Sequence, residues 1–433
     1  MNRRDFLKAA IASSALLLHG SSGWAYKNPQ AQGNQKKLIV IFLRGGIDGL
    51  NVVVPYGDPN YYTLRPTIAV QPPGQPAGAL DLDGHFGLNP GMQALMPFWM
   101  TKSLAFVHAA GSPDPTRSHF DAQDYMESGI PGEKMSSSGW LNRLVSELPS
   151  DHSPVQALSI GPILPKILSG PATVATVERV GAPTKTSLDR PMIGDLFGSM
   201  YSARHDYLAS AFEEGMSAHK SINDSLSQPT PVIASVATDV SSQFPSMSAD
   251  DRKEQAVANR GAPTPRNYSN FGKQLSNLFT KDPTVQVAFL DFGGWDTHIR
   301  EGNGKGALAD KLNTLSMGLA DLAAGLGELY KDTTIVVMSE FGRTAKENGN
   351  GGTDHGHGNA MWLMGGGIDG GKVYGRWGGL ANNELHEQRD LPTSTDFRSV
   401  LSRSLGDQMN ISQASLAKIF PDFRDRANPF VST

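Results

Sequence analysis

Three apolar runs stand out along the chain, and each is followed by a polar, glycine-containing segment. Residues 37–43 lead into RGGIDG, residues 285–292 lead into GGWDTH, and residues 335–338 lead into SEFGRT. Short apolar runs rich in β-branched residues are typical of buried strands. Because α/β proteins place their active sites outside the carboxyl ends of such strands, the three runs are predicted to converge on one polar site.

A leucine stripe over residues 307–330 predicts the longest helix. Its leucines recur at alternating steps of four and three, which places them on one helical face. The helix lies between two of the predicted strands, so it suits the crossover of a parallel βαβ unit. The other predicted elements are helices over residues 90–100, 190–225 and 268–279, a strand over residues 104–107, and a short helix with short strands within residues 139–167.

The N-terminus has the pattern of an export signal. Arg3 and Arg4 precede Phe-Leu and an apolar run that is too short to span a bilayer. This order indicates a twin-arginine signal peptide over residues 1–25, followed by a linker over residues 26–36. The alternative is a basic N-terminus that precedes alanines by chance. The predicted mature protein is periplasmic or exported, uses the twin-arginine export machinery, and has no stable membrane span.

Composition limits the class of protein. The 433 residues are long enough for a large α/β core, and we predict a single domain over residues 37–425 with an irregular insert at 226–266. The 38 Lys and Arg residues are not clustered and the formal net charge is −4, which argues against a nucleic-acid partner. The chain has no cysteine, so any metal must be bound by histidines and carboxylates.

Two short motifs carry candidate metal ligands. They are DTH at residues 296–298 and HGH at residues 355–357. In extended backbone, residues two apart share a face, so each pair could reach one ion. Histidine nitrogen and carboxylate oxygen together suit zinc and related ions. The alternative is that these histidines cap loops and bond to backbone. With the acids that follow the other strands, the candidate ligands are Asp48, Asp296, His298, Glu340, His355 and His357.

Ser118 is the candidate nucleophile. A hydroxyl beside a metal can lose its proton near neutral pH, but Ser118 followed by Asp121 also matches the start of a capped helix. The two roles are compatible, because a helix N-terminus favours negative charge. The adjacent His119 is a candidate ligand or general acid, or else it packs beside Phe120.

Three arginines flank the motifs and could clamp an anionic ester, although each could instead pair with a local acid. Arg343 is grouped with Ser118 and His119 as a catalytic candidate. The candidates for substrate binding are Arg44, Asn51 and Arg117, where Asn51 could instead make ordinary turn hydrogen bonds.

The strings LRGGIDGLNVVVP, RSHFDAQDYMESG, GGWDTH and SEFGRTAKENGNGGTDHGHGN occur in this order after the signal. Together they resemble domain-of-unknown-function family 1501, twin-arginine-exported bacterial proteins grouped with the alkaline phosphatase and sulfatase superfamily. The resemblance covers roughly residues 37–425. It implies an alkaline-phosphatase-like three-layer α/β/α sandwich with a mostly parallel central sheet, and two-metal hydrolysis of phosphate or sulfate esters.

The resemblance also implies roles for single residues. Asp48 resembles the carboxylate after the first strand and Ser118 the nucleophile. Asp296 and His298 resemble the acid and histidine of the first metal. Either His355 or His357 resembles the last histidine ligand of the first metal.

Two departures from the superfamily pattern narrow the prediction. Glu340 stands where the superfamily has Asp followed by His, and here Phe341 follows it, so one expected ligand of the second metal is missing. Pro113 stands where a formylglycine-type sulfatase needs Cys or Ser, which disfavours that type of enzyme.

We therefore predict an exported metal-dependent hydrolase that acts on phosphate-type esters of small molecules or polymers. It would use one or two divalent ions, zinc first and manganese or calcium as alternatives. A non-catalytic periplasmic or cell-surface binding or assembly protein on the same fold is the second hypothesis. A sulfate-ester hydrolase is the third.

Overall fold

The computed structural model describes residues 35–149, 155–161, 163–177, 191–202, 215–217, 249–265, 270–425 and 429–430. The predicted signal peptide over residues 1–25 lies outside the described residues. So do most of the predicted linker over residues 26–36 and most of the predicted insert over residues 226–266.

A large, mostly parallel sheet forms the centre of the described chain. Its strand order is β11-β5-β10-β9-β1-β8-β6-β7, with β12 beside β5. Strand β1 (Lys37–Leu43) lies between β9 (Thr333–Ser339) and β8 (Val287–Phe292) and is parallel to both. Strand β10 (Asn359–Met364) runs antiparallel to β9 and to β5 (Leu104–Gly111). The three apolar runs of the sequence are therefore adjacent parallel strands, as predicted.

The remaining strands are short. They belong to the edges of the large sheet or to a separate three-stranded sheet of β2, β3 and β4. Their bounds are β2 (Val53–Val54), β3 (Leu80–Asp81), β4 (Gly87–Leu88), β6 (Ala157–Ile160), β7 (Ala175–Val177), β11 (Lys372–Tyr374) and β12 (Thr395–Asp396).

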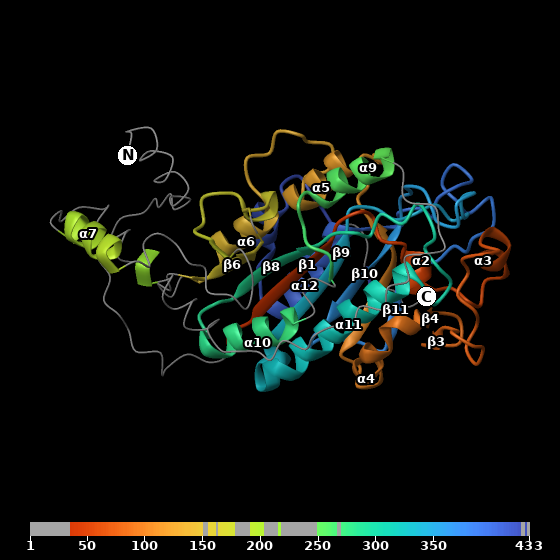
Figure 1. Ribbon diagram of the computed structural model, residues 1–433, viewed down its shortest axis with the longest axis horizontal. Coiled ribbons are helices and arrows are strands. Elements are labelled where there is room, and N and C mark those ends of the chain that lie inside the picture. The colour runs from red at the N-terminus through yellow and green to blue at the C-terminus, as the bar shows by residue number, and fades with distance from the viewer. Residues whose placement is uncertain are drawn as a thin grey trace.

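The two faces of the large sheet pack against two different helix layers (Figure 1). Ile39 and Ile41 of β1 share a core with α10 (Phe271–Lys281) and α11 (Ala307–Leu326). Their neighbours in β1 face the opposite core, with α6 (Trp140–Glu147) and α12 (Phe397–Met409). Because both faces are covered, β1 reads as a continuous apolar run rather than an alternating one. This arrangement confirms the predicted three-layer α/β/α class.

Helix α11 confirms the crossover predicted from the leucine stripe. It connects β8 to β9 and passes β1, which lies between them. Its stripe leucines are buried from Leu308 to Leu326. The helix ends earlier than predicted, because Gly327 has φ +52° and the chain continues as a 3-10 helix over Gly327–Asp332.

Two other predicted helices differ in detail. The segment over residues 90–100 starts as a 3-10 helix over Pro90–Leu95 and becomes α4 (Met96–Met100), because Pro97 lacks the N–H that a continuous α-helix needs. Helix α7 (Pro191–Ser202) accounts for part of the helix predicted over residues 190–225. The other helices are α2 (Gly49–Val52), α3 (Pro59–Leu64), α5 (His119–Ser128), the 3-10 helix Lys166–Leu168, α9 (Ala249–Asn259) and α13 (Gln413–Ile419).

The loops after β1, β8 and β9 pack directly against one another at the carboxyl edge of the sheet. The backbone N–H of Gly45, after β1, donates to Glu340, after β9, at 2.8 Å. Gly45 has φ +118°, and a Cβ there would lie 2.6 Å from the backbone nitrogen of Asp296, after β8. Only glycine fits this close approach. The polar segments that follow the three apolar runs therefore meet, as the sequence predicts.

Candidate metal centre

A cluster of potential metal ligands lies at this edge of the sheet. His119, Asp296 and His355 each offer one nitrogen or carboxylate oxygen, and these atoms all lie within 4.8 Å of one another. His119 is the first residue of α5, Asp296 follows β8, and His355 lies in the loop between β9 and β10. The Asp296 carboxylate lies 3.3 Å from His355 Nε2 and 3.7 Å from His119 Nε2. Three separate parts of the chain thus supply the candidate ligands.

His298 completes the surroundings of Asp296. Its Nε2 lies 3.0 Å from Asp296 Oδ1 and 3.0 Å from His355 Nε2. Nitrogen and oxygen ligands of a tetrahedral zinc ion lie about 3.3 Å apart, given bonds of about 2.0–2.1 Å. The spacings around Asp296 are close to that value. A second group of potential ligands contains His298, His355 and the half-exposed Glu254 of α9.

Each histidine is oriented by a partner on its other ring nitrogen. The three pairs are His119 with the Glu340 carboxylate (2.8 Å), His298 with the Asp354 carboxylate (3.3 Å), and His355 with the Arg117 carbonyl (3.0 Å). Carboxylates and carbonyls only accept hydrogen bonds, so Nδ1 carries the proton in each ring. The Nε2 atom that faces Asp296 is then the one available to a metal.

The pairing of His119 with Glu340 favours the protonated histidine and the ionised carboxylate. Burial opposes ionisation of Glu340, but the hydrogen bond and charge of His119 and a hydrogen bond from Gln123 outweigh it and lower the Glu340 pKa to about 2. Burial likewise disfavours the imidazolium of His119, but the Asp296 carboxylate, 3.7 Å from Nε2, and the hydrogen-bonded Glu340 carboxylate raise its pKa to about 9. His119 Nε2 is buried and has no hydrogen-bond partner among the described residues. A metal ion can replace the proton at such a nitrogen.

Arg343 fixes Asp296 and links the loops around it. Its buried guanidinium donates to the carbonyls of Gly45 and Gly46, to that of Thr353 at 3.1 Å, and to Asp296 Oδ1. Burial opposes ionisation of Asp296, but the three surrounding histidines and the charge of Arg343 hold its pKa far below the usual value. The structure thus places Arg343 behind the carboxylate, with its N–H groups occupied by the protein.

Phe341 orients two of the imidazoles. Its ring centroid lies 4.8 Å from that of His119 and 4.9 Å from that of His355. Phe341 is buried, so it excludes water from one side of the cluster. The residue that replaces an expected ligand of a second metal therefore packs against the first centre.

Asp48 and Asn51 are not brought to this cluster. Both carboxylate oxygens of Asp48 bond to Arg65, at 2.5 Å and 3.1 Å. Burial opposes ionisation of Asp48, but Arg65 outweighs it and lowers the Asp48 pKa. Asn51 accepts from Tyr61 and Arg65 and donates to Glu301. Neither cluster of potential ligands among the described residues includes Asp48, so the structure groups the ligands around one centre.

His357 also turns away from the cluster. Its Nδ1 lies 2.7 Å from Asp390 and its Nε2 lies 3.0 Å from the carbonyl of Pro115. The expectation that His355 and His357 share one ion assumed extended backbone, but residue 357 lies in a bend. The structure brings only His355 to Asp296.

The remaining candidates have structural partners. Ser118 is exposed and caps α5, with its hydroxyl 3.5 Å from the Asp121 backbone nitrogen. Arg117 and Arg44 pair with local acids rather than standing free. The pairs are Arg117 with Asp390 and Glu387 (2.8 and 2.7 Å) and Arg44 with Glu127 and Asp291 (2.9 and 2.5 Å).

Sequence reasoning missed Gln123, which connects the centre to its surroundings. Its amide nitrogen donates to Glu340 at 2.9 Å and its amide oxygen accepts from Arg44 at 2.7 Å. Gln123 lies one turn after His119 in α5, and residues four apart share a helical face. The four-residue spacing between His119 and Gln123 is therefore the sequence signal that could have identified Gln123. Arg65 and Glu301 gave no comparable signal, since Arg65 lies 17 residues from Asp48 and Glu301 lies 250 residues from Asn51, which is beyond one helical turn.

Comparison with known proteins gives a family and several solved structures of low similarity. The family described as Protein of unknown function (DUF1501) matches residues 35–420. The search of curated proteins finds no match. Among the described residues, no helix is long and apolar enough to cross a membrane.

Solved structures resemble the chain at low identity. One is a protein in the alkaline phosphatase superfamily from Vibrio parahaemolyticus, with 11% identity, TM-score 0.35, and coverage of 87% of this chain and 72% of that one. Another is the PsFucS1 sulfatase from Pseudoalteromonas sp., with 13% identity, TM-score 0.34, and coverage of 87% and 70%. A third is alkaline phosphatase from the Antarctic bacterium TAB5, with 12% identity, TM-score 0.29, and coverage of 77% and 93%.

The family match spans nearly the whole of the described chain, including every loop that contributes to the candidate centre. This protein therefore belongs to the family described as Protein of unknown function (DUF1501).

Proposed function

We propose that this protein is an exported metal-dependent hydrolase of phosphate-type esters. The observation that carries the proposal is the convergence of His119, Asp296 and His355 donor atoms within 4.8 Å, with His298 beside them. Histidine nitrogen with carboxylate oxygen suits zinc first, and manganese as an alternative. When bound, such an ion supplies polarisation of the ester and a more acidic water molecule.

The protein's own residues prepare this site for chemistry. Glu340 keeps the proton on His119 Nδ1, and Arg343 holds Asp296 in place. Phe341 shields one side, whereas the His298 side chain is 25% exposed and marks the side open to solvent. A centre with a dry side and an open side suits a substrate that reaches the ion from solvent.

A test begins with purified protein that has been stripped by a chelator. Zinc, manganese and calcium are titrated back separately, bound metal is measured, and phosphomonoesters, phosphodiesters and sulfate esters are assayed. We expect one ion per chain and metal-dependent turnover of a phosphate ester that Asp296→Asn abolishes. Protein that binds no ion stoichiometrically under any loading condition would rule the proposal out.

A second candidate function is a non-catalytic binding or assembly protein in which the ion is structural. The observation that favours it is the number of donors, because four protein ligands close a tetrahedral zinc site, whereas catalytic sites keep one position open. His298 decides between the two, since it is the fourth donor and the most exposed. Stable metal binding without turnover of any ester, together with loss of metal on His298→Ala, would favour the structural role.

A further inference from the structure

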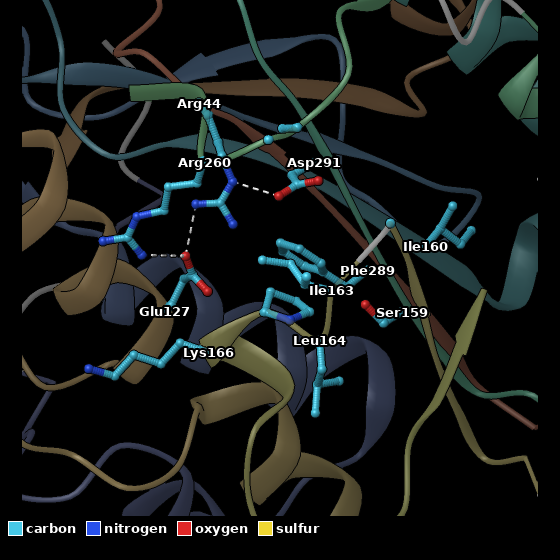
Figure 2. Close-up of a pocket in the computed structure, with 14 residues that line it drawn as sticks. Arg44, Glu127, Ser159, Ile160, Ile163, Leu164, Lys166, Arg260, Phe289 and Asp291 are labelled. Atoms are coloured by element: carbon cyan, nitrogen blue, oxygen red, sulfur yellow. Dashed lines mark hydrogen bonds and ion pairs between the residues drawn. The ribbon is translucent and has the colours of Figure 1, made fainter. Parts of the chain in front are cut away.

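A small cavity lies at the carboxyl edge of the sheet, the edge that also carries the candidate metal centre. Its volume is about 110 Å³. Strand β6 contributes Ser159, strand β8 contributes Phe289 and Asp291, and the loop after β1 contributes Arg44 (Figure 2). Ligands of open α/β sheets bind outside the carboxyl ends of the strands, so the position is that of a binding site.

Three polar groups lining this cavity are not satisfied by the part of the chain that the structure describes. Ser159 is 1% exposed and its hydroxyl has no hydrogen-bond partner among the described residues. Arg44 uses Nε and Nη1 on Asp291, Gln123 and Glu127, which leaves Nη2 without a bond to a described residue. Asp291 accepts from Arg44 through Oδ2, and no described side chain donates to its Oδ1. The cavity therefore presents one donor, one acceptor and one hydroxyl that can be either.

The charges around the cavity balance. Arg44 pairs with Glu127 and Asp291, while Lys166 and Arg260 both pair with Asp124, at 2.8 and 3.1 Å. Three cations face three carboxylates. A free anion would meet the carboxylates and a free cation would meet the guanidinium groups, so the site favours a neutral ligand that both donates and accepts.

The apolar residues that line the cavity indicate the size and the carbon skeleton of the ligand. Ile160, Ile163, Leu164 and Phe289 line the cavity beside the polar groups, and Ile163 is 64% exposed at its rim. A cavity of about 150 Å³ holds one benzene ring, so this smaller space holds two or three carbon atoms with their substituents. Carbons that carry hydroxyls would meet the apolar wall with C–H groups and the polar base with O–H groups.

We propose that this cavity binds a neutral vicinal diol, such as a glyceryl unit or the edge of a sugar ring. One hydroxyl donates to Asp291 and accepts from Arg44, and its neighbour bonds with Ser159. The rest of the ligand extends past Ile163 into solvent.

A chain of hydrogen bonds connects this cavity to the candidate metal centre. Arg44 donates to Gln123 at 2.7 Å, Gln123 donates to Glu340 at 2.9 Å, and Glu340 holds His119 at 2.8 Å. We assign the diol to the alcohol part of the ester, and this assignment rests on the proposed function. Diol binding itself requires no metal.

Saturation-transfer NMR with two probes tests the proposal. Glycerol and methyl glucopyranoside represent the open-chain and ring sources of the diol, and cyclohexanol is the control with a ring but one hydroxyl. Wild-type protein, Ser159→Ala and the matched control Ser276→Ala are compared, because Ser276 is equally buried but donates to a backbone carbonyl in α10. Each measurement is made on chelator-treated and on zinc-loaded protein.

We expect at least one diol to bind with millimolar affinity, cyclohexanol to bind at least tenfold more weakly, and Ser159→Ala to weaken the diol about five- to tenfold. Ser276→Ala should bind as wild type does. No binding of either diol, or equal binding by Ser159→Ala, would overturn the proposal. Diol binding by a protein that takes up no metal would preserve the cavity assignment and remove the proposed hydrolase, so the two failures are distinguishable.

Discussion

Two buried polar clusters lie near the same edge of the sheet, and they differ in how completely the protein satisfies them. The Asp48 cluster comprises Asp48, Asn51, Tyr61, Arg65 and Glu301, all fully buried and bonded to one another. The Asp296 cluster contains three imidazoles that face one carboxylate, and His119 Nε2 bonds to nothing described. A cluster whose polar groups all bond to one another stabilises the fold. A cluster with an unsatisfied buried group is arranged to bind an ion or a ligand.

The charges lead to the same conclusion. Burial and the charge of Asp48 raise the Glu301 pKa well above its usual value, which favours the neutral form of Glu301 and lets Arg65 balance Asp48. In the other cluster, Asp296 and Glu340 carry two negative charges against the single charge of Arg343. With neutral imidazoles this would leave one negative charge in excess. The proton on His119, whose pKa is about 9, balances it, and a metal ion can take the place of that proton.

The largest expected effect comes from breaking the complete cluster. Arg65→Met leaves Asp48 buried without its partner and should lower the free energy of unfolding by about 3–5 kcal/mol. Urea unfolding followed by circular dichroism measures the change. The control is Arg403→Met, which removes an exposed pair with Asp407 and should cost about 0.5 kcal/mol or less. A similar small loss for both variants would contradict the structural role of the Asp48 cluster.

A pH effect tests a histidine that has no carboxylate partner. His108 is fully buried, and burial lowers its pKa to about 4 despite a hydrogen bond to the Val53 carbonyl. The unfolded chain binds the proton with a pKa of about 6.5, so stability is complete above pH 6.5 and falls as pH drops towards 4. The loss should approach about 3 kcal/mol.

Urea unfolding between pH 7 and pH 4 measures that loss, with His108→Gln as the comparison. The variant is expected to be less stable at pH 7 but to lose less stability on acidification. Parallel stability curves for the two proteins would refute the assignment to His108.

Substitution of the two histidines of the HGH motif should have different effects on metal affinity. His355→Ala removes a donor within 3.3 Å of Asp296, so metal affinity should fall by more than about 100-fold, beyond the effect of losing an outer partner. His357→Ala is the matched control, because His357 bonds to Asp390 and Pro115 instead. Zinc titration with a competing chelator measures both. Equal losses in the two variants would mean that His355 is not a ligand.

A smaller effect is expected from the partner of a ligand. Glu340→Gln weakens the orientation of His119 and should reduce zinc affinity by about 10- to 100-fold, with the fold retained. Glu347→Gln is the control, since that carboxylate bonds to backbone nitrogens of residues 67 and 68. Unchanged zinc affinity in Glu340→Gln would show that the hydrogen bond to His119 does not support metal binding.

The smallest effect is expected at the helix cap. Ser118→Ala removes an exposed capping hydroxyl and should cost about 0.5–1 kcal/mol of stability, while zinc affinity stays unchanged. Thermal unfolding and zinc titration check both statements, and Ser118→Asn should restore the cap. If an ester substrate is found and Ser118→Ala abolishes its turnover without unfolding the protein, Ser118 is the nucleophile and its cap is a secondary role.

The sequence determined the layers of the molecule and the edge where its polar residues gather. Buried strands and an amphipathic helix leave local patterns, because each residue's burial follows from its own period along the chain. The runs that became β1, β8 and β9, and the stripe that became α11, were therefore readable. The family followed from motif order, which is also a property of the sequence.

Only the tertiary structure decided which polar side chains meet. Asp48 and Glu340 both follow buried strands, but Arg65 binds the first and His119 the second. A bend separates His355 from His357, although the two lie only two positions apart. The reason is physical: a carboxylate's role depends on the charge and donors that surround it. Here those come from segments up to 295 residues away, as Gly45 and Glu340 are.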